Sequence, residues 1–132
     1  MPQPDLAANP APGFVQHPEH EVHTQGFAGT VTVHADEVQV ARSDNAILVL
    51  ETNHAPVYYI PAEDVDQSLL RPSSRVTRCP FKGKATHWNI AIGEHEIDNA
   101  VWAYEMPYDE MLELGGMMAF YSNKVAITAT PA

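Results

Sequence analysis

The chain has 132 residues and a formal net charge of −10, with 7 Lys and Arg against 17 Asp and Glu. This acidic balance argues against duplex nucleic acid as a partner, because proteins that bind it gain affinity by neutralising several phosphates. The longest apolar run, Ala46 to Leu50, is too short to cross a bilayer. A single cysteine excludes an intramolecular disulfide and a cysteine-rich zinc site. We therefore expect one acidic globular domain stabilised by an apolar core.

The N-terminal residues differ in composition from the rest of the chain. Residues 1–13 contain four of the eleven prolines, one charged residue and few bulky apolar side chains. Burial of such a segment does not offset its ordering entropy, so we predict a flexible tail followed by a single domain over residues 14–132. The segment lacks the basic and apolar regions of a secretory signal, and a cytoplasmic location is therefore expected.

From Phe14 onward apolar residues recur with a period of two, which indicates a mainly β chain. Short strands are predicted at residues 30–33, 38–40, 47–50 and 57–60, with polar turn residues between them. Because the connections are short, these strands are expected to pair with their neighbours as an antiparallel meander.

The second half of the chain combines one predicted helix with further strands. A helix is predicted over residues 62–70, because Val65 and Leu69 are spaced at i, i+4 and Pro72 provides a stop. Strands are predicted at residues 85–92 and 95–97. Residues 117–121 and 125–127 are expected to form a hairpin, and residues 108–114 either a helical turn or a loop.

A cationic segment, residues 71–84, contains five of the seven Lys and Arg residues and the cysteine, whereas no carboxylate occurs between Gln67 and Gly93. A local positive potential in an acidic chain is suited to holding an anion. Within this segment the Cys79 thiol is close in sequence to Lys82, and Gly83 allows a ligand to approach the backbone. The alternative interpretation is a buried small side chain followed by a turn.

Glu51 ends an apolar run and shares a strand face with Ile47 and Val49 by alternation. Tyr59 lies on the next predicted strand, where antiparallel pairing would bring its phenol near that carboxylate. The pair is interpreted either as an acid–base pair or as a structural hydrogen bond between strands.

Three histidines, His17, His20 and His23, lie within seven residues that also include two carboxylates. A metal site needs ligands that converge from rigid elements, and this stretch borders the predicted tail, so a solvated strand is favoured and no metal site is predicted. His87, next to Trp88, is the better candidate for a functional histidine, with packing of the imidazole on an aromatic ring as the alternative.

The aromatic residues Trp102, Tyr104 and Tyr121 combine apolar rings with polar tips. They are predicted to form the floor of a pocket or, alternatively, to fill the core with their polar atoms exposed to solvent.

Two motifs carry a resemblance to a known family. The elements Tyr59-x-Pro61-x-x-Asp64-Val65 and Cys79-Pro-x-Lys82-Gly83 occur in this order. With them, residues 18–128 resemble the domain-of-unknown-function family 427, which has also been filed as a nucleotidyltransferase domain. The resemblance implies an all-β fold of twisted antiparallel sheets, akin to the Mss4-like, tent-shaped group. It also places on motif positions the residues Glu51, Tyr59, Cys79, Lys82, Gly83, Trp102 and Tyr121.

The sequence predicts that a pocket around the Cys79-Pro-Phe-Lys-Gly83 loop binds a small anionic or polar metabolite. The candidate catalytic residues are Glu51, Tyr59, Cys79 and Lys82. The candidate ligand-binding residues are Arg42, Gly83, His87, Trp102, Tyr104 and Tyr121. In this scheme Lys82 anchors the anion, Glu51 or Tyr59 transfers protons, and Cys79 is a nucleophile.

No metal or other cofactor is predicted, and neither duplex nucleic acid nor a membrane is expected as a partner. Two other functions remain open at this point. One is a non-catalytic module that docks an acidic protein through an exposed strand edge or through the cationic segment. The other is the nucleotidyl transfer that the family label suggests.

Overall fold

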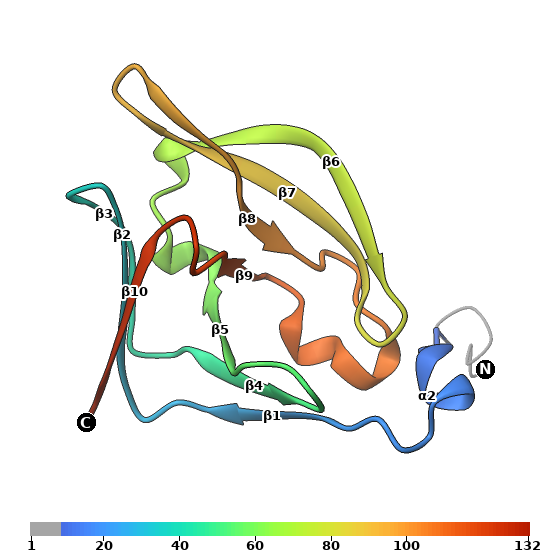
Figure 1. The fold of residues 1–132 in the computed structure, drawn as a ribbon. Helices are drawn as coiled ribbons and strands as arrows, with labels where there is room; N and C mark the ends of the chain where they lie inside the picture. The colour runs from blue at the N-terminus through green and yellow to red at the C-terminus, as the bar shows by residue number, and fades with distance from the viewer. Residues whose placement is uncertain (1–8) are drawn as a thin grey trace, which may run out of the picture.

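The computed structural model describes residues 9–132, which form two antiparallel sheets and several short helices (Figure 1). The larger sheet contains, in spatial order, β1 (Val22–Gly26), β4 (Ile47–Glu51), β5 (Val57–Pro61), β9 (Met117–Phe120), β8 (His95–Ala103), β7 (Gly83–Ile92) and β6 (Leu70–Cys79). The smaller sheet contains β10 (Ala126–Pro131), β2 (Gly29–Ala35) and β3 (Val38–Ser43). The predicted all-β class is confirmed.

The helices are the four-residue α2 (Gly13–Gln16) and three 3₁₀ segments, namely η1 (Ala62–Asp64), η2 (Gln67–Leu69) and η3 (Asp109–Leu114). None of the helices within residues 9–132 is long and apolar enough to span a lipid bilayer.

Alternation along the strands divides the buried side chains between the two faces of the larger sheet. On β9, Met118 and Phe120 pack with valines of the smaller sheet, whereas Met117 and Ala119 face the opposite way and contact Tyr59 and its neighbours. All four β9 residues are buried, as expected of a strand with a packed layer on each side. The second face is the one that carries the pocket described below.

The larger sheet is curved, so its two ends approach each other. β6 and β7 form a long hairpin that arches over the sheet toward the end that carries β4 and β1 (Figure 1). Residues on the β6–β7 turn therefore meet the end of β4, although three strands lie between β4 and β7 in the order of the sheet. The order β4-β5-β9-β8-β7 makes this contact possible only through curvature.

The segment before β1 is packed against the domain from residue 9 onward. The Gly13 amide donates to the Pro80 carbonyl at 2.9 Å, and the rings of Phe14 and Phe81 meet edge to face with centroids 5.0 Å apart. Ala11 is 1% exposed. Of the predicted tail, residues 9–13 are thus held by the β6–β7 turn and by η3, and residues 1–8 lie outside the described part of the chain.

The predicted helix over residues 62–70 is wrong. Two 3₁₀ turns flank Val65, which is extended and bridges Ala41 of β3, while the Asp66 amide donates to the Val40 carbonyl at 2.7 Å. These backbone bonds to β3 replace the hydrogen bonds that a continuous helix would make, so tertiary pairing overrides local propensity. Residues 109–114 do form helical turns, in agreement with the first of the two alternatives for that region.

The predicted hairpin of residues 117–121 and 125–127 is also wrong. Both edges of β9 are already paired, with β5 and with β8, so no edge is free for β10, which joins β2 instead. The predicted meander holds for β2–β3 and β4–β5, but β4 takes β1 as its second neighbour and does not pair with β3. The sequence does not predict β6 as a strand, because Pro72 and several charged residues interrupt its apolar pattern. Such residues are typical of edge strands, and β6 lies at an edge of the larger sheet.

We predict that Gly13→Ala lowers the free energy of unfolding by about 1–3 kcal/mol, the usual cost of an overpacked contact. A Cβ at this position would lie 2.6 Å from the Phe81 ring and 2.9 Å from the Pro80 carbonyl oxygen. Urea denaturation measures the change. Gly26→Ala is the matched control, because a Cβ there meets nothing within 4 Å. Equal stability of the two variants would contradict close packing of the N-terminal segment.

Candidate functional site

A pocket of about 770 Å³ opens on the concave face of the larger sheet. Its wall comes from the end of β4, the β4–β5 loop, β5, the last residues of β6, the β6–β7 turn, β8 and the connection between β9 and β10. Seven of the ten predicted site residues line it, namely Glu51, Tyr59, Cys79, Lys82, Trp102, Tyr104 and Tyr121.

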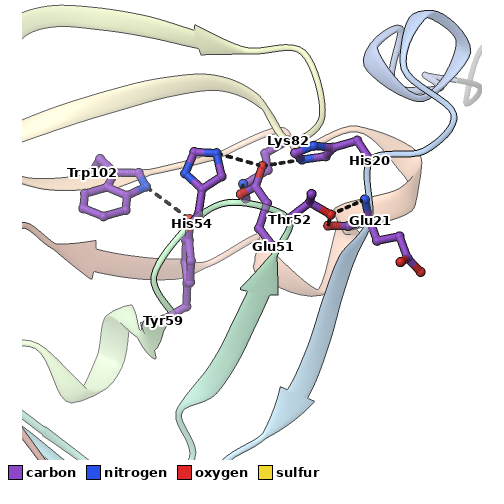
Figure 2. A network of polar contacts seen from close by, with 8 residues as sticks. All are labelled: His20, Glu21, Glu51, Thr52, His54, Tyr59, Lys82 and Trp102. Carbon is purple, nitrogen blue, oxygen red and sulfur yellow. Dashed lines mark hydrogen bonds and ion pairs between the residues drawn. The ribbon is translucent and has the colours of Figure 1, made fainter.

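The charged end of the pocket is built around Glu51 (Figure 2). The Lys82 ammonium, from the β6–β7 turn, donates to Glu51 Oε1, and His20 Nε2 donates to Glu51 Oε2 at 2.8 Å. His54 Nε2 lies 3.8 Å from the same Oε2. The side chains of Lys82 and Glu51 are only 7% and 10% exposed. This nearly buried ion pair therefore joins the two ends of the curved sheet.

Burial alone would raise the pKa of Glu51, but the hydrogen bonds from Lys82 and His20 outweigh it, so that the pKa lies below its ordinary value. The carboxylate is ionised at neutral pH and both of its oxygens are engaged. A general base works best with a pKa near the operating pH and with an accessible lone pair. Glu51 has neither property in this structure.

His20 and His54 are members of the site that sequence reasoning did not assign. His20 lies flat against Phe81, with ring centroids 3.9 Å apart and planes at 17°, and so covers the Glu51–Lys82 pair. The solvated-strand interpretation of His20 does not hold, since its ring is partly buried against Phe81 and Glu51. Its partner is 31 residues away, and no local pattern indicates such a contact.

Buried phenols form the centre of the pocket. The Trp102 indole N–H donates to the Tyr59 hydroxyl oxygen at 3.2 Å, and the ring of Tyr104 stacks on Tyr59 with centroids 6.5 Å apart. Burial, as the largest cause, raises the pKa of both Tyr59 and Tyr104 well above the usual range. Both residues are therefore neutral hydrogen-bond donors at physiological pH. The predicted cross-strand bond between Tyr59 and Glu51 is replaced by the bond from Trp102, since Tyr59 pairs with Ile47.

Tyr121 forms a side wall and is backed by a buried histidine. His87 is 0% exposed, its Nε2 shares a hydrogen bond of 3.2 Å with the Tyr121 hydroxyl, and the two rings are nearly parallel. Burial and then the charge of Arg75 lower the pKa of His87, so the imidazole is neutral. His87 thus supports the wall from behind and does not itself line the pocket.

The remaining predicted residues lie elsewhere. Arg42 is exposed on β3 in the smaller sheet, away from this pocket. Gly83 begins β7 with φ of 131°, a backbone conformation that favours glycine, and it faces the Met106–Pro107 backbone. Its role in the structure is therefore the tight β6–β7 turn. Thr77, Ser122 and Asn123 line the pocket without having been predicted.

Within residues 9–132, no group of three or more His, Cys, Asp or Glu is arranged to hold a metal ion. At the Glu51 cluster the carboxylate oxygens are already bonded to Lys82 and His20.

We predict that Lys82→Met lowers the free energy of unfolding by about 3 kcal/mol, because it leaves a buried carboxylate without its main partner. The double variant Lys82→Met with Glu51→Leu should recover most of that loss. Urea denaturation provides the values, and Lys84→Met, an exposed neighbour, should change stability by less than about 0.5 kcal/mol. A Lys82→Met loss no larger than that of Lys84→Met would contradict the account.

The same pair predicts a pH dependence of stability. Because folding lowers the pKa of Glu51, its contribution is complete above the ordinary value of 4.5 and is lost as the pH falls through the lower value of the folded state. The difference in free energy of unfolding between wild type and Glu51→Gln should be constant near pH 7 and should shrink below pH 4.5. Urea titrations at a series of pH values test this, and a difference that grows on acidification would be inconsistent with it.

Comparison with known proteins gives one result beyond the structure. No curated protein matches the chain. A family model described as a domain of unknown function, DUF427, matches residues 23–130. The matched region contains the pocket residues from Glu51 to Tyr121, and His20 lies just before it. Because the match covers most of the 132 residues, the chain belongs to the DUF427 family.

Proposed function

We propose that this protein binds a small metabolite in which a carbonyl or carboxylate group is attached to an apolar or cyclic group. The oxygen of that carbonyl or carboxylate would accept hydrogen bonds from the pocket. The observation that carries the proposal is an aromatic-walled pocket whose central polar groups are donors. Its volume of about 770 Å³ falls within the range of small-molecule sites.

The donor character follows from how the polar atoms are used. Trp102 donates to the oxygen of Tyr59, which leaves the Tyr59 proton for another acceptor. Tyr104 is also a neutral phenol, and its pKa is raised chiefly by burial. The carboxylate of Glu51 already accepts from Lys82 and His20. A ligand rich in acceptors therefore complements this pocket better than one rich in donors.

Electrostatics support the same class of ligand. The pocket is lined by one anionic residue, Glu51, and by two cationic residues, Lys82 and Arg78, in a chain of net charge −10. Lys82 is neutralised by Glu51, so the anchoring role predicted for it passes to the phenols and to the potential of Arg78. Arg78 is exposed and lies between Thr77 and Cys79 on β6.

The test is a thermal-shift screen of small aromatic and alicyclic carboxylates, each paired with its neutral amide, together with Mg²⁺–ATP. A compound that binds only the folded protein raises its melting temperature. The carboxylates are expected to bind more tightly than their amides. Tyr104→Phe should weaken a hit by about five- to tenfold, through loss of one hydrogen bond, and Tyr108→Phe, a tyrosine outside the pocket, should not.

Three outcomes would count against the proposal. If no compound in the set binds, the protein-interaction module becomes the better hypothesis. If hits bind Tyr104→Phe as well as wild type, the site lies elsewhere. Magnesium-dependent binding of ATP with no carboxylate hit would favour the nucleotidyl transfer suggested by the family label.

A further inference from the structure

The single cysteine of the chain lies in the wall of this pocket. Cys79 is the last residue of β6, pairs with Gly83 across the tight turn and is partly buried. It packs against the cluster that contains Tyr59 and Tyr104. The thiol therefore shares one compartment with both phenols, and that compartment opens to solvent through the pocket.

The second observation is the state of Tyr104. Its side chain is 8% exposed, yet its hydroxyl makes no hydrogen bond to another side chain within residues 9–132. The only fully enclosed polar side-chain atom without a partner in that part of the chain is His87 Nδ1, so the Tyr104 hydroxyl opens to the pocket. Buried polar groups normally have partners, and a donor left free in a pocket points to an acceptor supplied by a ligand.

The three groups are within electrostatic reach of one another. After burial, the neighbouring Tyr59 and then Cys79 contribute to the raised pKa of Tyr104, and Cys79 contributes likewise to that of Tyr59. All three groups also line one pocket and pack in one cluster, so an acceptor oxygen that the phenols hold would place its carbon in the same space as the sulfur of Cys79. This is the arrangement that addition to a carbonyl group needs, a nucleophile on one side and hydrogen-bond donors for the developing oxyanion.

We propose that Cys79 adds reversibly to the carbonyl carbon of an aldehyde bound in this pocket, with Tyr59 and Tyr104 as donors to the carbonyl oxygen. In the step, a bond forms between sulfur and the carbonyl carbon, and the π electrons of the carbonyl move onto oxygen. The thiol proton ends on that oxygen, giving a hemithioacetal. Nothing is oxidised or reduced, and no further reactant is required.

The walls indicate what kind of aldehyde would fit. The rings of Tyr59, Trp102, Tyr104 and Tyr121 line the same pocket as the thiol. Trp102 meets Tyr59 edge to face and Tyr121 at a tilt, with ring centroids 6.1 and 4.4 Å apart. Such faces and edges accommodate another flat apolar group. An aldehyde with an aromatic or similarly apolar body is therefore favoured over a sugar-like one.

This inference deepens the proposed function and rests on it. The probe is phenylacetaldehyde labelled with carbon-13 at the carbonyl, and its control is 2-phenylethanol, which has the same body without the electrophile. Bound to the wild-type protein, the label should move from the carbonyl region to the hemithioacetal region of the carbon-13 spectrum. The aldehyde should also slow alkylation of Cys79 by iodoacetamide, measured by intact mass, by at least fivefold more than the alcohol does.

Variants separate the covalent step from simple binding. Cys79→Ser and Cys79→Ala should both abolish the hemithioacetal signal, and using two replacements guards against a fold defect in one of them. Tyr104→Phe should weaken the aldehyde adduct by about five- to tenfold while changing the affinity for 2-phenylethanol little, and Tyr108→Phe should change neither.

The inference is overturned if aldehyde and alcohol protect Cys79 equally, or if the shifted signal persists in Cys79→Ser, which would indicate an adduct with a lysine. Hits among the carboxylates of the earlier screen, combined with no aldehyde adduct, would leave the proposed function standing and reject this step alone. Failure of every probe to bind would reject both.

Discussion

The ion pair between Glu51 and Lys82 is the contact on which the geometry of the pocket depends. It joins the end of β4 to the β6–β7 turn, two places at opposite ends of a curved sheet. Because both side chains are nearly buried, each charge stabilises the fold only while the other is present. His20 completes the closure, since its ring stacks on Phe81. Its hydrogen bond to Glu51 is drawn in Figure 2.

The Glu51–Lys82 ion pair also determines which polar groups of the pocket are free to bind a ligand. A lysine and a carboxylate that neutralise each other are poorly suited to moving protons or to holding an anion, although their sequence context indicates both roles. The groups left free are neutral phenols and a thiol, set among aromatic rings. We propose that a site of this composition selects for a ligand that carries an oxygen acceptor on an apolar group. The charged residues act mainly by holding the walls in place.

The sequence predicts the parts of this account that depend on alternation. The period of two correctly indicates a β fold, and it places Glu51 on the face of Val49 and Tyr59, where the pocket lies. Predictions based on short-range pattern fail where a distant partner intervenes. Val65 leaves the expected helix to pair with Ala41. In the same way His20, beside a proline-rich segment, becomes part of the site only because curvature brings Phe81 and Glu51 to it. The tent-shaped relationship implied by the resemblance stays a prediction.

We propose that a small molecule occupies the pocket held by the Glu51–Lys82 pair, and the two tryptophans of the chain allow a direct test. The Trp102 indole N–H bonds to Tyr59 inside the pocket, whereas Trp88 packs against the other core. A nitrogen-15 NMR titration with a mixture of small carboxylates and aldehydes should shift the Trp102 indole signal and leave that of Trp88 in place. Movement of Trp88 alone, or of neither signal, would contradict the account.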